Sequence, residues 1–290
     1  MTSIALAPEQ VARAYREACR FDVITFKPGN VSCEEPGHGM DARDFLRSAA
    51  VSAPWLAAPD LTVGARIAGA IAATRAAVGC NTNLGIVLLA APLASAALSP
   101  HAARDLRVRL TARLAALTVA DAAGAYEGIR LAAPGGLGAA PEADVREAPM
   151  VDLGQAMALA ADRDRIASQY GTDYADVFEV GLPALLAALP AAGGLSDAVQ
   201  LAYLTLLAAQ PDSHIARKYG PLIAEGVRVR AAAVACPGKA CENPAAFSDA
   251  LHALDRELKS CGYNPGTTAD LTVASLFAYL LTQALRLREA

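Results

Sequence analysis

The chain has 290 residues, 54% of them hydrophobic and 19% charged, a composition that can build a large packed core and that excludes wholesale disorder. The net charge of −4 and the absence of a basic patch argue against nucleic acid as a partner. Charged residues interrupt any apolar run at the start, so we expect no signal peptide and a soluble, cytoplasmic protein with reduced thiols.

Helical periodicity dominates the sequence, because apolar residues recur at intervals of three and four and strictly alternating runs are scarce. We therefore predict an all-α fold, a single compact bundle of about ten to twelve helices in one domain, residues 1–290. The Gly- and Pro-rich stretch near 133–149 is the place where two lobes could divide. Helices are expected at about 8–20, 41–56, 62–78, 84–98, 99–117, 119–131, 153–168, 174–189, 197–209, 222–235, 245–260 and 268–287.

The most apolar stretch is Leu84–Leu98, which has fifteen residues and contains Pro92. A membrane-spanning helix needs roughly 20 residues, so this stretch is interpreted as a buried core helix, and no membrane partner is expected. Ser99 and Pro100 follow it as a cap and a first-turn proline, and they predict the start of the next helix.

The first of four polar segments runs Lys27-Pro28-Gly29-Asn30 and is followed by His38 and Asp41. A tight loop of this kind can hold an anion with backbone N–H groups and one ammonium group. The alternative is a plain turn, with Asp41 as the cap of the following helix.

The second segment contains Asn81, Thr82 and Asn83 between two strongly apolar helices. Two amides and a hydroxyl are costly to bury unless each finds a partner, so they suit hydrogen bonds to a ribose or a phosphate. A capped helix-to-helix turn explains the same residues.

The third segment places Asp212, Ser213, His214, Arg217 and Lys218 within seven residues. An acid, a hydroxyl, an imidazole and two cations can bind a charged substrate. An exposed charged turn is the plainer interpretation.

The fourth segment, Asn264–Leu271, precedes the last predicted helix, with Thr267 or Thr268 as its cap and Asp270 in its first turn. The carboxylate could serve a hydroxyl group or magnesium, or it could simply stabilise the helix end.

Two further groups allow weaker metal interpretations. Asp162–Arg165, followed by Asp173, Asp176 and Glu179, is either a solvated helix face or a second metal-binding edge. Cys236 and Cys241 have a metal-like spacing but no matching second pair.

Taken in order, the four segments resemble the motifs of the triphosphoribosyl-dephospho-CoA synthase family. Its Lys-Pro-Gly-Leu-Val, His-x-Asp-Met-Asp and Ser-Ala elements are similar to Lys27–Val31, His38–Asp41 and Ser48-Ala49. Its Gly-Val-Asn-Thr-His-Lys-Gly element is similar to Gly79–Gly85. Its Asp-Ser-with-Arg, Pro-Gly-x-Thr-Ala-Asp-Leu and Gly-Leu-Pro elements correspond to Asp212–Gly220, Pro265–Leu271 and Gly181–Pro183.

The chain departs from the family pattern at three places. Gly39 stands where the family has its first Asp, and Asn83 and Leu84 replace a His-Lys pair. A Glu expected on the preceding helix has no counterpart near residues 69–73. The missing carboxylate and basic groups indicate a diverged branch, in which the acceptor can differ.

The resemblance implies an ATP-dependent transferase in the biosynthesis of a cofactor, in which a hydroxyl of dephospho-CoA attacks C1′ of the ATP ribose and adenine leaves. Carboxylates would take the hydroxyl proton and stabilise positive charge at C1′, and Mg²⁺ and cations would hold the triphosphate. Asp41, Asp212 and Asp270 are assigned to catalysis and magnesium, and Lys27, Arg217 and Lys218 to phosphate. The remaining ligand contacts would come from Asn30, His38, Asn81, Thr82, Asn83, Ser213, His214 and Thr268.

Two alternatives remain open. One is an enzyme of the same fold with another acceptor, for example in the biosynthesis of methanopterin- or methanofuran-type one-carbon cofactors. The other is a non-catalytic helical protein that binds a nucleotide. A homodimer is compatible with either.

Overall fold

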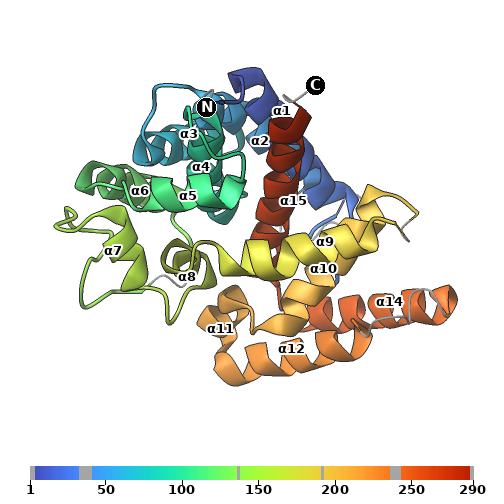
Figure 1. Ribbon diagram of the computed structural model, residues 1–290. Coiled ribbons are helices and arrows are strands. Elements are labelled where there is room, and N and C mark those ends of the chain that lie inside the picture. The colour runs from blue at the N-terminus through green and yellow to red at the C-terminus, as the bar shows by residue number, and fades with distance from the viewer. Residues whose placement is uncertain (1–3, 33–40, 136–137, 191–192, 236–242, 288–290) are drawn as a thin grey trace. The chain divides into compact units, whose positions relative to one another are not determined.

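The computed structural model describes residues 4–32, 41–135, 138–190, 193–235 and 243–287 (Figure 1). These ranges contain fourteen α-helices, one π-helix and no β-strand, with a single isolated bridge between Ile4 and His101. The predicted all-α fold is therefore confirmed. The number of helices exceeds the prediction because the helix expected at 153–168 is divided and because the third polar segment forms a helix of its own, Ser213–Tyr219.

The chain forms two compact units. The first contains Met1–Arg20, Arg43–Ala175 and Phe277–Ala290, and the second contains Phe21–Ala42 and Asp176–Leu276. Helices α1 (Pro8–Ile24) and α15 (Gly266–Leu287) contribute residues to both. The stretch near 133–149, where two lobes could divide, lies inside the first unit.

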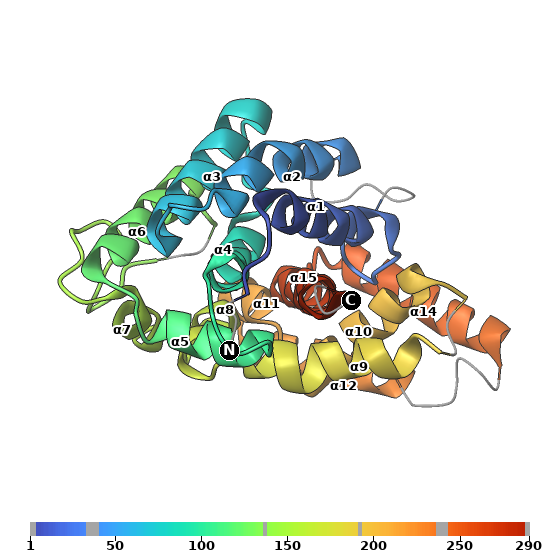
Figure 2. The ribbon, with the colours of Figure 1, turned by 45° about the horizontal axis from the view of Figure 1, so that its top comes forward.

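The first unit is built around α4 (Leu84–Leu98), which is buried from Leu84 to Ala97. Four neighbours pack against it, which explains why it is apolar on every face and confirms the predicted core helix (Figure 2). The other helices of this unit are α2 (Ala42–Ala57), α3 (Val63–Val78), α5 (Leu106–Leu114), α6 (Val119–Ala132), α7 (Leu153–Ala158) and α8 (Arg165–Gly171).

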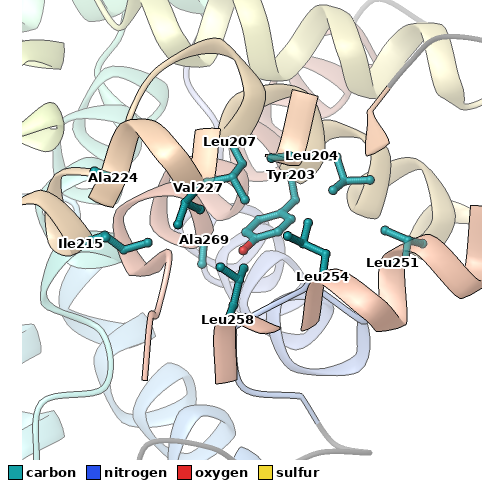
Figure 3. Close-up of a cluster of buried hydrophobic side chains, with 11 residues drawn as sticks. Tyr203, Leu204, Leu207, Ile215, Ala224, Val227, Leu251, Leu254, Leu258 and Ala269 are labelled. Carbon is teal, nitrogen blue, oxygen red and sulfur yellow. The ribbon is translucent and has the colours of Figure 1, made fainter. Parts of the chain in front are cut away.

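The second unit has its own apolar core, to which five helices contribute (Figure 3). Tyr203, Leu207, Val227, Leu254 and Leu258 are among its fully or almost fully buried members. Its helices are η1 (Asp176–Gly181), α9 (Leu182–Ala188), α10 (Leu195–Ala209), α11 (Ser213–Tyr219), α12 (Pro221–Val234) and α14 (Pro244–Ser260), followed by the first part of α15.

The helix predicted at 99–117 is shorter than expected. Ser99 ends α4 instead of opening the next helix, and α5 begins at Leu106. Asp105 caps α5, because its carboxylate accepts from the amides of Arg107 and Val108. The helix therefore begins where the Asp105 side chain accepts from two backbone amides, and not at the Ser99-Pro100 pair that predicted an earlier start.

Two other predicted helices are broken. The one at 153–168 divides into α7 and α8, and Asp164 caps the second piece. The one at 174–189 begins only at Asp176, because Asp173 and Tyr174 have left-handed backbone angles, and its first part is a π-helix. Pro183 has no amide hydrogen, so the regular helical ladder cannot continue through it.

Helix α15 is the one described helix long and apolar enough to cross a membrane by length and composition. Within the most apolar part of α15, 67% is buried inside the protein, as in the core helix of a globular fold.

Candidate functional site

Residues Thr25–Asn30, which we call the anchored loop, are held by side chains of α10. The Thr25 hydroxyl lies 3.0 Å from that of Ser196. The Gln200 amide donates to the Phe26 carbonyl at 2.7 Å, and the Tyr203 hydroxyl donates to the Pro28 carbonyl at 2.7 Å. Burial raises the pKa of Tyr203 well above its usual value, so the hydroxyl keeps the proton that it donates.

Two carboxylates complete this anchoring. Asp22 forms a buried ion pair with Lys27, whose side chain is fully enclosed. Asp255 accepts from the Gly29 amide at 2.8 Å and pairs with Lys259 at 3.0 Å. The Lys27 ammonium, expected on a phosphate, is therefore neutralised inside the protein.

Gly29 is required in this loop for two reasons. Its φ is +78°, a conformation that L side chains rarely adopt, and a Cβ atom there would lie 2.8 Å from Leu258 and 3.0 Å from Pro265. The Lys-Pro-Gly element thus packs directly against the fourth segment, and Asn30 donates to the Asn264 side chain at 2.9 Å.

Asp212 is completely buried and links α11 to α15. One carboxylate oxygen accepts from the amides of His214 and Ile215, at 2.9 and 3.1 Å. The other accepts from the amide and hydroxyl of Thr268, at 2.8 and 2.7 Å. These four bonds use the acceptor sites of the carboxylate, so the geometry does not support Asp212 as a general base or magnesium ligand.

The third and fourth segments make further contacts. Ser213 and Thr267 hydroxyls lie 3.0 Å apart, and a Cβ atom at Gly266 would lie 3.5 Å from Nδ1 of His214. The first, third and fourth polar segments therefore meet within the second unit. We call this meeting point the three-segment junction: Thr25–Asn30, Asp212–Gly220 and Asn264–Asp270.

Asp270 is the half-buried acid of the junction. Helix α15 begins at Gly266, two residues earlier than predicted, so Asp270 is its fifth residue and lies just beyond the first turn. Thr267 and Thr268 lie inside the helix rather than capping it. Arg217 is half-buried and Lys218 is exposed, so both cations lie nearer the surface than Lys27.

Asp41 directly precedes α2, as expected of a helix cap, and is half-buried. No group of three or more His, Cys, Asp or Glu side chains able to hold a metal ion occurs in the described part of the chain. Asp41, Asp212 and Asp270 therefore do not form the expected magnesium site there. His38, Cys236 and Cys241 lie outside the described residues.

The second segment belongs to the first unit, where it joins a buried set of polar side chains. Thr82 and Ser48 hydroxyls are 2.6 Å apart, and Asn83 donates to the Ser52 hydroxyl at 3.4 Å. The Tyr15 hydroxyl lies 3.0 Å from that of Ser52, and burial raises its pKa well above the usual value. We call these five side chains the hydroxyl network. Asn81 is separate, because its side chain caps Leu84 at 3.1 Å.

No motif in the sequence points to the side chains that hold these segments in place, which are Tyr15, Asp22, Ser52, Tyr203 and Asp255. Asp255 had a detectable signal, because it interrupts an apolar helix face formed by Leu251, Leu254 and Leu258.

Comparison with known proteins decides the family. The sequence matches the CitG family, ATP:dephospho-CoA triphosphoribosyl transferase, over residues 8–289. The chain belongs to this family. It is therefore an ATP-dependent triphosphoribosyl transferase, as the motifs predicted.

A solved structure agrees with the fold of this transferase. The structure is of a protein from Archaeoglobus fulgidus provisionally named a triphosphoribosyl-dephospho-CoA synthase. It superposes with a TM-score of 0.62 and 24% identity, over 82% of this chain and 98% of the other. At that identity the likeness shows the fold alone. Comparison with curated proteins gives no match.

Proposed function

We propose that this transferase moves the 5-triphosphoribosyl group of ATP to a hydroxyl acceptor such as dephospho-CoA, with release of adenine, and that the three-segment junction binds the reactants. The observation that carries this proposal is the meeting of three family segments through the Asn30–Asn264, Asp212–Thr268 and Ser213–Thr267 hydrogen bonds, which join residues 234, 56 and 54 positions apart in sequence. Family membership supplies the reaction.

Asp270 is the carboxylate that we assign to the chemistry. The glycosidic bond between C1′ and adenine breaks, the acceptor oxygen bonds to C1′, and the acceptor loses its proton. A carboxylate can take that proton and stabilise the positive charge that develops at C1′. Asp270 suits this role better than Asp212, because Asp270 is half-buried whereas Asp212 is completely buried.

Arg217 and Lys218 are assigned to the triphosphate, with His214 and Ser213 beside them on α11. We reassign Lys27 and Asp212 to holding the junction together, because Lys27 forms an ion pair with Asp22 and Asp212 accepts hydrogen bonds from Thr268. A buried cation that already has a carboxylate partner gains little from a second anion.

Magnesium remains part of the proposal as an ion that accompanies the triphosphate. Mg²⁺ is commonly held by substrate phosphates with one or two carboxylates rather than by a full protein cage. Since the described residues contain no such cage, the ion would neutralise phosphate charge, and we assign the half-buried acids Asp270 and Asp41 to it.

The identity of the hydroxyl acceptor can be inferred from the places where the chain departs from the family motif. Asn83 and Leu84 replace a basic pair of the family motif, and this replacement favours a same-fold enzyme with a different hydroxyl acceptor, for example in methanopterin- or methanofuran-type cofactor biosynthesis. We propose a cytoplasmic enzyme, in line with the reduced thiols expected from the sequence.

Adenine release tests the reaction. The enzyme is incubated with ATP, magnesium and dephospho-CoA or another candidate hydroxyl acceptor, and products are separated by chromatography. We expect free adenine and a triphosphoribosylated acceptor. ADP or AMP in place of adenine contradicts the reaction class, and ATP binding without turnover under every acceptor favours the non-catalytic alternative.

Asp270→Asn tests the assigned acid, because it keeps the size of the side chain and removes its charge. We expect the turnover number to fall by roughly 10²- to 10⁴-fold, the usual contribution of a general acid or base. Asp249→Asn, an exposed acid of α14, is the matched control and should retain full activity. Unchanged turnover in Asp270→Asn refutes the role.

A further inference from the structure

Asn83 is a buried amide with an incomplete set of hydrogen bonds. Asn83 is 4% exposed, and the bond that its Nδ2 donates to the Ser52 hydroxyl is long at 3.4 Å. Its Oδ1 atom is buried and accepts no hydrogen bond from the described residues. A buried acceptor without a donor is destabilising, so its presence requires an explanation.

The hydroxyls around Asn83 have no proton to offer it. Ser52 donates to the Ser48 carbonyl at 2.6 Å, and Ser48 donates to the carbonyl four residues before it, also at 2.6 Å. Each hydroxyl has one proton, so Tyr15 must donate to Ser52 and Thr82 must donate to Ser48.

Turning the Asn83 amide over does not remove the difficulty. Oδ1 would then face the Ser52 oxygen, whose proton is already committed, and could accept only the proton that Tyr15 otherwise gives to Ser52. The two N–H groups would lose their acceptor. The arrangement that satisfies most groups leaves the Asn83 oxygen in need of an external donor.

The first turn of α4 has the opposite need. Asn81 caps the Leu84 amide, but Asn83 makes no cap bond. The amides of Gly85 and Ile86 find no acceptor within the described ranges. A buried helix start carries partial positive charge, so these amides attract an oxygen atom.

A group that carries both a proton and a lone pair, such as a hydroxyl, meets both needs. A hydroxyl donates its proton to the Asn83 oxygen and offers its own oxygen to the amides. An ionised phosphate has no proton to donate, and an ammonium group has no lone pair for the amides.

We infer that Asn83 and the first turn of α4 form a neutral subsite for a substrate hydroxyl, and that Asn83 determines specificity for it. The hydroxyl belongs either to the ribose of ATP or to the acceptor. This inference rests on the proposed function for the identity of the ligands, and it resolves the open choice between sugar and phosphate for this segment in favour of the sugar type.

Asn83→Leu tests the inference, because leucine has a similar volume and no polar atoms. In the ligand-free protein we expect the melting temperature to stay the same or rise, since an unsatisfied oxygen is removed. Asn81→Ala is the control, and there we expect a lower melting temperature, because that variant removes a satisfied cap.

Calorimetry then measures dissociation constants for ATP, 2′-deoxy-ATP, 3′-deoxy-ATP and dephospho-CoA. If the ribose is the ligand, wild type should bind ATP about tenfold more tightly than one deoxy analogue, the worth of one hydrogen bond, and Asn83→Leu should lose that preference. If the acceptor is the ligand, Asn83→Leu should raise the dissociation constant for dephospho-CoA by a similar factor and leave the dissociation constant for ATP unchanged.

Unchanged dissociation constants for all four compounds overturn the inference, whatever happens to the melting temperature. Binding is measured without turnover, so these constants decide the inference even if no adenine is released. Absence of adenine, by contrast, contradicts only the proposed reaction.

Discussion

At the scale of single residues, charge in a polar segment did not distinguish ligands from structural groups. Lys27 and Asp212 have the residue types of a phosphate binder and a catalytic acid, yet each is enclosed with internal partners. Charged groups are expensive to bury unpaired, so a buried one acquires partners from the protein itself. Asp270, Arg217 and Lys218 keep part of their surface and remain the candidates for substrate.

Asp212 should matter more for stability than an ordinary helix cap. Asp212→Ala removes four hydrogen bonds in a buried site and leaves Thr268 without its acceptor, so we expect a loss of about 3 kcal/mol in the free energy of unfolding. Asp105→Ala removes an exposed cap of α5 and should cost about 1 kcal/mol. Equal losses in urea denaturation of the two variants contradict the linking role.

At the scale of secondary-structure elements, Gly-Leu-Pro at Gly181–Pro183 has a packing explanation. Gly181 ends the π-helix η1, and a Cβ atom there would collide with the Ser275 side chain of α15. The glycine has ordinary helical backbone angles, so close approach of the two helices, not backbone conformation, requires it.

Two glycine substitutions should therefore have effects of opposite sign. Gly181→Ala forces Ser275 and Leu206 to move, and we expect a loss of about 2 kcal/mol in stability. Gly226→Ala lies on α12, where the nearest atom would be 3.9 Å away at the flexible end of Arg230, and should gain about 1 kcal/mol through helix propensity. Thermal unfolding of both variants checks this pair, and a stabilised Gly181→Ala would refute the contact.

At the scale of the whole molecule, buried tyrosines make stability depend on alkaline pH. Burial raises the pKa of Tyr15, Tyr170, Tyr174 and Tyr203 above the value of about 10 that they have when unfolded. The unfolded chain therefore holds fewer protons above pH 10, and the stability that the neutral hydroxyls contribute is present below pH 10 and is lost as pH rises further.

We expect the free energy of unfolding to fall steadily above about pH 10, with the tyrosinate absorbance of these four residues appearing together with unfolding. Tyr203→Phe should be less stable at neutral pH, because the Pro28 carbonyl loses its donor, but should show a shallower decline in alkali. Ionisation of all eight tyrosines in a protein that keeps its helical circular dichroism would contradict this prediction.

The sequence by itself determined the all-α fold, the core helix α4, most helix positions and the family, because these depend on local periodicity and on short runs of residues. It also marked four polar segments as family motifs, and the structure brings the first, third and fourth of them together. Only the tertiary structure decided which polar side chains are already satisfied. Lys27 forms an ion pair with Asp22, the Asp212 carboxylate accepts hydrogen bonds from inside the protein, and the Asn83 oxygen accepts none from the described residues. Each outcome depends on the partners that the fold, not the local sequence, brings within hydrogen-bonding distance.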